Sequence, residues 1–221
     1  MAHAFFLGID VADDASDTPG AATVTLIEKT EADDGAAQYR LDSIAHHESP
    51  PEADALAGRL QSLVADVPYI GRTTIVVNTT TPFGRDLHDA LDGRGLAPVA
   101  VTLTGGMGAA AESTDAMGVH LSEYDAAETL ATCYREGRLD VSGPSTEDVS
   151  RLARGIQRFV EALTDAEDAS DVPDEVDATP QRPEAFDTHV TSAALALWTG
   201  AERSFDPTEH LKEPLRTGPS T

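Results

Sequence analysis

Three apolar runs open the chain, and short polar or turn-forming segments separate them. The first run, "AFFLGID", ends at an aspartate, and an acidic segment containing Pro and Gly follows it. Because the separations are short, the runs are most simply strands of one meander. We therefore predict three consecutive strands, at residues 4–10, 21–29 and 36–48.

The spacing of apolar residues changes after this meander. Leucines and a valine then recur at helical intervals, which predicts a helix over residues 50–67 with its prolines at the start. Beyond it, strand and helix patterns alternate. We predict strands at 73–78 and 97–106, a Gly- and Ala-rich loop at 105–119, a short extended piece at 139–141, and helices at 82–95, 122–138, 145–163 and 187–203.

The order of these elements predicts the fold class. A three-stranded meander followed by alternating helices and strands is the order of the α/β ribonuclease H-like fold. We expect its central mixed five-stranded sheet flanked by helices. One domain would span residues 1–205, with an acidic insertion loop at about 164–186, and residues 206–221 would form a flexible C-terminal tail.

Charge is the strongest compositional feature. The chain has 39 acidic and 15 basic residues, for a formal net charge of −24, and Lys29 and Lys212 are its only lysines. A partner of opposite charge is one explanation. The even spread of the acids favours another, a halophilic protein, because molar salt screens self-repulsion within a few ångströms. We therefore expect the high-salt cytoplasm of a halophilic archaeon or of its virus-infected host.

Other compositional features exclude several classes of protein. No apolar run approaches the roughly 20 residues that cross a bilayer, and the start of the chain lacks the basic region of a signal peptide. Cys133 is the single cysteine, so no intrachain disulfide forms. We expect no membrane partner and no zinc site.

The candidate site follows from the strand ends. In "IVVNTTTPFG", Asn78 lies at the tip of a buried strand, and Asp10 ends the first strand. In the ribonuclease H-like fold, catalytic metals lie across the tips of these two strands and a C-terminal helix, which here begins at Asp187. His189, two residues later, could face the same site from the first helical turn.

Three segments resemble the nuclease domain of viral terminase large subunits, from tailed phages and archaeal viruses. They are "IVVNTTTPFGRDLHDALDGRGLAPVAVTLTGG", "YDAAETLATCYREGRLDV" and "FDTHVTSAALALW". Their order and spacing match the family's strand, turn and helix, its following helix, and its closing helix. The similarity extends from Phe5 to Arg203.

The resemblance implies a two-metal endonuclease that cuts concatemeric viral DNA during packaging. Asp10 matches the first-strand aspartate, and Asp187 matches the first aspartate of the closing motif. Asn78 stands where an acid is expected, and Thr188 stands where a second aspartate would be. We expect Asp10, Asn78, Asp187 and His189 to hold Mg²⁺ or Mn²⁺ with weakened affinity, and cleavage to be slow or absent.

The partners follow from the same resemblance. We expect double-stranded DNA as substrate, contacted by basic residues such as Arg85, Arg94 and Arg135. The chain contains no GxxxxGK[ST] phosphate loop, so a packaging ATPase would be a separate chain.

Alternative interpretations stay open. The chain could be a catalytically inactive ribonuclease H-fold subunit for DNA binding or assembly, or a RuvC-type junction resolvase, a class that can use a histidine on this helix. Asn78 could be a plain turn residue, Asp187 a plain helix cap and His189 a cap-region histidine.

Overall fold

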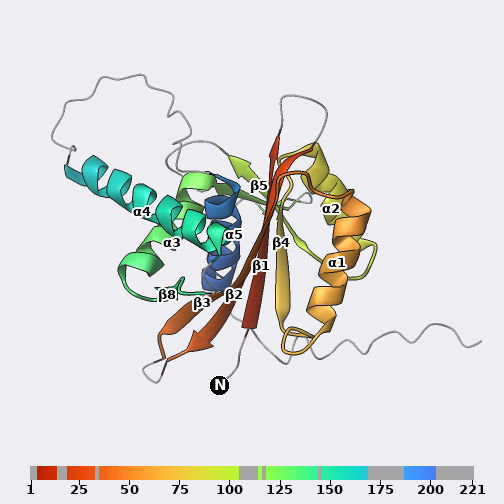
Figure 1. Ribbon diagram of the computed structural model, residues 1–221, viewed down its shortest axis with the longest axis horizontal. Helices are drawn as coiled ribbons and strands as arrows, with labels where there is room; N and C mark the ends of the chain where they lie inside the picture. Colours follow the sequence, from red (N-terminus) through yellow and green to blue (C-terminus); the bar gives the residue numbers. More distant parts are fainter. Residues whose placement is uncertain are drawn as a thin grey trace, which may run out of the picture.

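A computed structural model describes residues 4–13, 19–32, 35–104, 114–115, 118–143, 146–168 and 187–202. Within these ranges the strands form one eight-stranded sheet, in the order β6-β7-β5-β4-β1-β2-β3-β8. Helices cover both faces of the sheet (Figure 1). The chain is therefore a three-layer α/β protein, as expected.

The centre of the sheet confirms the predicted order. Strands β1 (Ala4–Asp13), β2 (Pro19–Glu31) and β3 (Ala37–His47) pair antiparallel as a meander. Strand β4 (Thr73–Asn78) then pairs parallel to β1, and β5 (Val99–Thr104) pairs parallel to β4. The order β3-β2-β1-β4-β5, with this mixture of directions, is that of the ribonuclease H-like fold.

The sheet is wider than the five predicted strands. Strands β6 (Thr114–Asp115) and β7 (Gly118–Ser122) extend one edge, and β8 (Leu139–Asp140) extends the other. The prediction of a loop over 105–119 is therefore wrong at its end. At Gly118, φ is 124°, and a Cβ would lie 2.7 Å from the carbonyl oxygen of Ala100, so glycine lets the two backbones approach.

Five helices are described, and they divide between the two faces of the sheet. Helices α1 (Ala53–Ala65) and α2 (Pro82–Asp92) cover one face. Helices α3 (Glu123–Arg135), α4 (Glu147–Asp168) and α5 (Thr188–Glu202) cover the other (Figure 1). Helix α4 runs five residues beyond its predicted end. The rest of the predicted acidic insertion and the predicted tail lie outside the described residues.

Helix α5 forms the centre of the second layer. Every residue from Thr188 to Gly200 is buried, which fits a helix that is apolar around most of its circumference. It lies close to β1 at Gly8, where a Cβ would stand 2.0 Å from the carbonyl oxygen of Ser192. Strand and helix can touch backbone to backbone only because Gly8 has no side chain.

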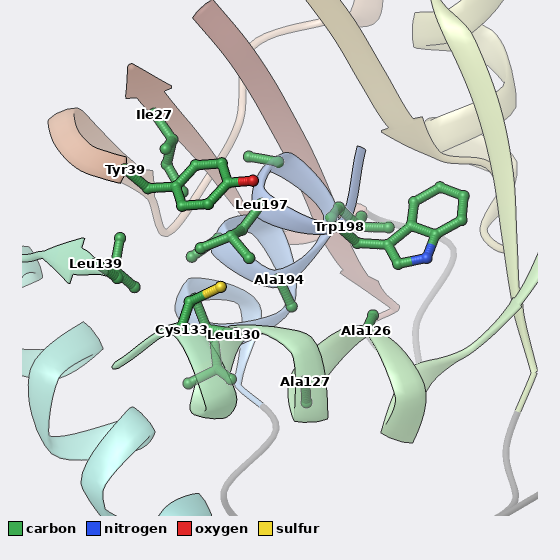
Figure 2. Close-up of a cluster of buried hydrophobic side chains, with 14 of the residues drawn as sticks. Ile27, Tyr39, Ala126, Ala127, Leu130, Cys133, Leu139, Ala194, Leu197 and Trp198 are labelled. Carbon is green, nitrogen blue, oxygen red and sulfur yellow. The ribbon is translucent and has the colours of Figure 1, made fainter. Parts of the chain in front are cut away.

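The C-terminal half of α5 packs in a continuous apolar core. Figure 2 shows Leu197 and Trp198 of α5 among side chains from β2, β3, α3 and β8. Cys133 is buried in this cluster. On the other face, a separate core packs leucines of α1 and α2 against β1, β2 and β4. In the described part of the chain, no helix is both long and apolar enough to cross a membrane.

Candidate functional site

Two of the predicted site residues meet at the carboxyl ends of β1 and β4. Ile9 pairs with Val77 in the parallel ladder, so Asp10 and Asn78 follow side by side. Both are buried, with 1% and 5% of their surface exposed. Asn78 Nδ2 donates a hydrogen bond of 2.6 Å to Asp10 Oδ1. The fold thus brings a carboxylate and an amide into direct contact at the expected place.

The amide of Asn78 has a defined orientation. Its Oδ1 accepts a hydrogen bond of 3.0 Å from the backbone N–H of Thr80, while its NH₂ group faces Asp10. The two bonds agree on which atom is nitrogen. The expectation was that Asn78 offers its carbonyl oxygen to a metal beside Asp10. In this structure that oxygen holds the following turn instead.

The threonines after Asn78 fasten this turn to β5 and start α2. The Thr79 hydroxyl donates to the carbonyl oxygen of Val101, and the Thr80 hydroxyl accepts from the N–H of Leu103. Thr81 caps α2, because its hydroxyl accepts from the N–H of Gly84. The "NTTTP" segment therefore has the structural role of an ordinary turn, and it also fixes the position of Asn78.

Asp187 caps the first turn of α5. Its Oδ1 accepts hydrogen bonds of 3.1 Å from the backbone N–H groups of His189 and Val190. The side chain remains 49% exposed, and its Oδ2 lies 3.8 Å from His189 Nδ1. The cap role is therefore present, and it leaves one carboxylate oxygen turned toward the ring of His189.

His189 faces β3 and α4. Its side chain is only 2% exposed, and its ring stacks on His46 with centroids 4.5 Å apart. Its Nε2 lies 3.4 Å from Oδ1 of Asp148 in α4, and Oδ2 of the same carboxylate accepts from the backbone N–H of His46. Burial lowers the pKa of His46, and the neighbouring His189 ring lowers it further. The stacked rings of His46 and His189 therefore lie where β3, α4 and α5 meet.

Hydroxyl groups connect the first turn of α5 to strand β2, at the residue that pairs with Asp10. Thr188 Oγ1 lies 2.7 Å from Thr23 Oγ1, which lies 2.9 Å from His46 Nδ1. Thr23 is the antiparallel pairing partner of Asp10. Thr188, found where the family resemblance places a second aspartate, therefore joins α5 to β2. Sequence reasoning missed Thr23 and Asp148, although strand alternation places Thr23 on the face of β2 turned toward α5.

The donor atoms suit a hard divalent cation in type. Carboxylate oxygens from Asp10 and Asp187 are the ligands that Mg²⁺ and Mn²⁺ prefer. Among the residues described, however, no three His, Cys, Asp or Glu side chains gather closely enough to hold a metal ion. The chemistry of the donors fits the expected cation, whereas the three-carboxylate cluster of a complete two-metal site is not assembled here.

The three arginines considered for DNA contact do not form one strip. Arg85 donates to the carbonyl oxygens of Thr79 and Thr80, and Arg94 pairs with Asp54 at 2.8 Å. Both lie on the α1–α2 side of the sheet, whereas Arg135 ends α3 on the opposite side (Figure 1). Arg85 and Arg94 therefore brace their own layer.

Comparison with known proteins gives structural likeness only. No family model matches the sequence, and no curated protein matches it significantly. Among solved structures, RuvC from Thermus thermophilus is 12% identical, with 89% of this chain and 92% of that chain covered and a TM-score of 0.38. The same RuvC bound to a Holliday junction substrate is 14% identical, with 89% and 92% covered and a TM-score of 0.30.

The nuclease domain of the human cytomegalovirus terminase, Mn soaked and inhibitor bound, is 11% identical to this chain. The match covers 88% of this chain and 82% of that one, with a TM-score of 0.43. The chain is thus similar to a terminase nuclease domain and to RuvC, the two kinds of protein that the sequence suggested. Because these TM-scores lie below 0.5, the assignment of a ribonuclease H-like fold rests on the strand order and directions.

Proposed function

We propose that this chain is a terminase-like, divalent-cation-dependent DNA endonuclease domain of ribonuclease H-like fold, with weakened activity. One observation carries the proposal. Asp10 and Asn78 lie buried and in contact at the carboxyl ends of adjacent parallel strands, and α5 packs against the same strands. Burying a carboxylate is costly, and here a neighbouring amide offsets part of that cost, so a carboxylate paired in this way at a strand tip is a candidate functional group.

The residues have distinct roles in this proposal. Asp10 and Asp187 would hold Mg²⁺ or Mn²⁺ through carboxylate oxygens, and a bound ion supplies activation of water and stabilisation of the leaving oxygen. Asn78 donates to Asp10 and keeps its carboxylate in place. His189, stacked on His46, fixes the first turn of α5 and thereby the position of Asp187.

The wider setting belongs to the same proposal. Cleavage of double-stranded viral DNA during packaging would need an ATPase, and these 221 residues contain no phosphate loop that could supply that activity. The net charge of −24 suits a host with molar internal salt. At such salt, phosphate contacts from surface arginines weaken steeply, so substrate binding would depend on a bound cation.

One observation favours a second candidate, a catalytically inactive subunit of the same fold. The NH₂ group of Asn78 donates a hydrogen bond to an oxygen of Asp10, the carboxylate that the endonuclease proposal assigns to a cation. A neutral amide donor there lowers the need for a metal ion. In this candidate the fold is kept for DNA binding or assembly.

Plasmid cleavage separates the two candidates. We would assay the wild type, Asp10→Asn and Asn78→Asp in molar KCl with Mn²⁺ and then Mg²⁺, beside Asp92→Asn as a control for loss of an exposed acid. A four-way junction assayed in parallel tests the resolvase alternative. Wild-type cutting that Asp10→Asn abolishes and Asp92→Asn retains would establish the nuclease.

The remaining outcomes are equally decisive. If only Asn78→Asp cuts, the chain is a nuclease fold disarmed at one ligand position, because the variant places two carboxylates together and recruits a cation between them. If no variant cuts either DNA, the inactive subunit replaces the endonuclease as the proposed function. Preferred cutting of the junction would identify a resolvase.

A further inference from the structure

Thr191, in the first turn of α5, has a buried hydroxyl group without a hydrogen-bond partner. The residue is 2% exposed, and its Oγ1 is the one buried side-chain oxygen or nitrogen among the described residues that has no partner. The other buried hydroxyls of α5 all have partners, on Thr23, Thr25 or the helix backbone. A buried hydroxyl left unpaired destabilises the fold, so this one needs an explanation.

Helix geometry gives the direction of the Thr191 side chain. With 3.6 residues per turn, each residue advances by about 100°, so His189 lies about 100° forward of Thr188 and Thr191 lies about 60° back. Thr188 contacts Thr23 on β2, and His189 contacts His46 on β3. Turning in the opposite sense leads from β2 to β1 and β4. Thr191 therefore faces the strands that carry Asp10 and Asn78.

Figure 2 supports this sense of rotation. Trp198, seven residues after Thr191, shares its side of the helix to within about 20°. In the figure, Trp198 lies on the side of α5 away from Tyr39 of β3. The side of the helix that carries Thr191 is thus the one that turns away from β3.

Strand geometry brings Thr191 to the level of the site. Gly8 lies against Ser192 and Ala196, and Asp10 shares its face of β1 because strand side chains alternate. Gly8 pairs with Val76, so Asn78 shares that face on β4. Side chains of a helix tilt toward its N-terminus, which directs Thr191 from the level of Ser192 toward these strand tips.

We propose that Thr191 is a further residue of the Asp10 site, where its hydroxyl oxygen contacts the divalent cation or a water molecule bound to that cation. This inference rests on the proposed function. Neither the motif spacing nor the family resemblance marks this position, since the expected acids match Asp187 and Thr188. A hydroxyl is a neutral oxygen donor, so it adds a ligand without adding charge to the buried carboxylate of Asp10.

Direct measurement of Mn²⁺ binding tests the inference without relying on cleavage. Free Mn²⁺ would be followed by electron paramagnetic resonance in molar KCl for the wild type, Thr191→Val, Thr191→Ser and Asp10→Asn. The matched control is Thr199→Val, which removes a buried hydroxyl of the same helix that donates to the carbonyl oxygen of Leu195. Thermal unfolding without metal checks that each variant folds.

The expected pattern is specific to a ligand role. Thr191→Val weakens Mn²⁺ binding by about tenfold or more, the cost of losing a ligand's supporting contact. Thr191→Ser keeps most of the affinity, and Thr199→Val leaves it unchanged. Without metal, Thr191→Val unfolds no earlier than the wild type, because it removes an unpaired hydroxyl, whereas Thr199→Val unfolds earlier.

Two results would overturn the inference, and they differ. If Asp10→Asn abolishes Mn²⁺ binding while Thr191→Val binds as tightly as the wild type, Thr191 is outside the site and the proposed function stands. If the wild type binds no Mn²⁺ at millimolar concentration, the metal-dependent function itself fails and the role of Thr191 fails with it.

Discussion

The first turns of α5 and its later turns, as far as Gly200, are both buried but packed in different ways. In the first turns, Thr188 and Ser192 meet Thr23 and Thr25 of β2 through hydroxyl pairs, and His189 stacks on His46. In the last turns, leucine and tryptophan side chains pack among hydrocarbon from β2, β3, α3 and β8 (Figure 2). One helix therefore joins a polar interface to an apolar one.

The difference separates stability from chemistry. Buried hydrocarbon is stabilising in proportion to its area, whereas a buried hydroxyl pair contributes little beyond offsetting its own desolvation. The apolar end of α5 therefore contributes most to holding the helix on the sheet, whereas the polar end fixes the first turns of the helix against β2.

Leu197→Ala, at the apolar end of α5, should cause the largest loss of stability. Leu197 is fully buried, so truncation loses its transfer free energy and leaves a cavity, at a cost of about 2–5 kcal/mol. Urea unfolding in molar KCl measures the loss. Leu63→Ala, at a half-buried position of α1, should lose clearly less. Equal losses would show that α5 has no special share in the stability.

Gly8→Ala tests the close contact between β1 and the middle of α5, where the polar and apolar ends meet. The new Cβ would stand 2.0 Å from the backbone oxygen of Ser192, so α5 must move away from β1, at about 1–3 kcal/mol. Gly58→Ala, in α1 with nothing within 4 Å of the new atom, should instead stabilise the protein by about 0.5–1 kcal/mol. A neutral Gly8→Ala would contradict the close backbone contact.

A double-mutant cycle on Thr25 and Ser192 sharpens the comparison. The two hydroxyl oxygens lie 2.7 Å apart, and Ser192 also donates to the carbonyl oxygen of His189. Ser192→Ala should cost about 1–3 kcal/mol because the buried hydroxyl of Thr25 loses its partner, and Thr25→Val should cost less because Ser192 keeps its bond to His189. The double variant should cost clearly less than the sum of the two. Additive losses in urea unfolding would mean that the pair does not interact.

The smallest expected effect is on the pH dependence of stability, through Tyr39 at the apolar end. Burial, as the main cause, raises the pKa of Tyr39 to about 12 from the usual 10. The unfolded chain then loses its phenol proton first as pH rises, so stability is complete below pH 10 and declines between about 10 and 12. Tyr39→Phe should flatten the decline of unfolding temperature over this window. An unchanged slope would exclude Tyr39 as its source.

The sequence predicted the central architecture because local patterns determine it. Alternating and helical spacing predicted the five central strands and the five helices of the described residues, and their order predicted the fold. Strand β7 was missed because its pairing with β5 is a long-range contact that a Gly- and Ala-rich segment does not signal locally. Helix α4 continues beyond residue 163 into acidic residues, and an acidic helical turn has the same composition as an acidic loop, so composition alone did not locate its end.

The site was predicted less completely than the fold. Strand order alone brought Asp10 and Asn78 together, because adjacent parallel strands end at the same edge. The amide orientation of Asn78 depends on the N–H of Thr80, which no spacing reveals. His189 was expected to face the strand tips, but the rotation of α5 places its ring against His46 and Asp148. The metal-binding roles of Asp10, Asn78, Asp187 and His189 remain predictions.

The central position of α5 also constrains how the protein folds. Strand β1 lies near the beginning of the chain and α5 begins at Thr188, yet the two pack backbone against backbone at Gly8. The loop between them must close before the core on that face exists, and such long-range contacts slow folding. During synthesis, the meander leaves the ribosome well before α5. Until α5 follows, the face of the meander that α5 covers remains exposed. A helix that lies far along the chain from β1 therefore completes the core on that face.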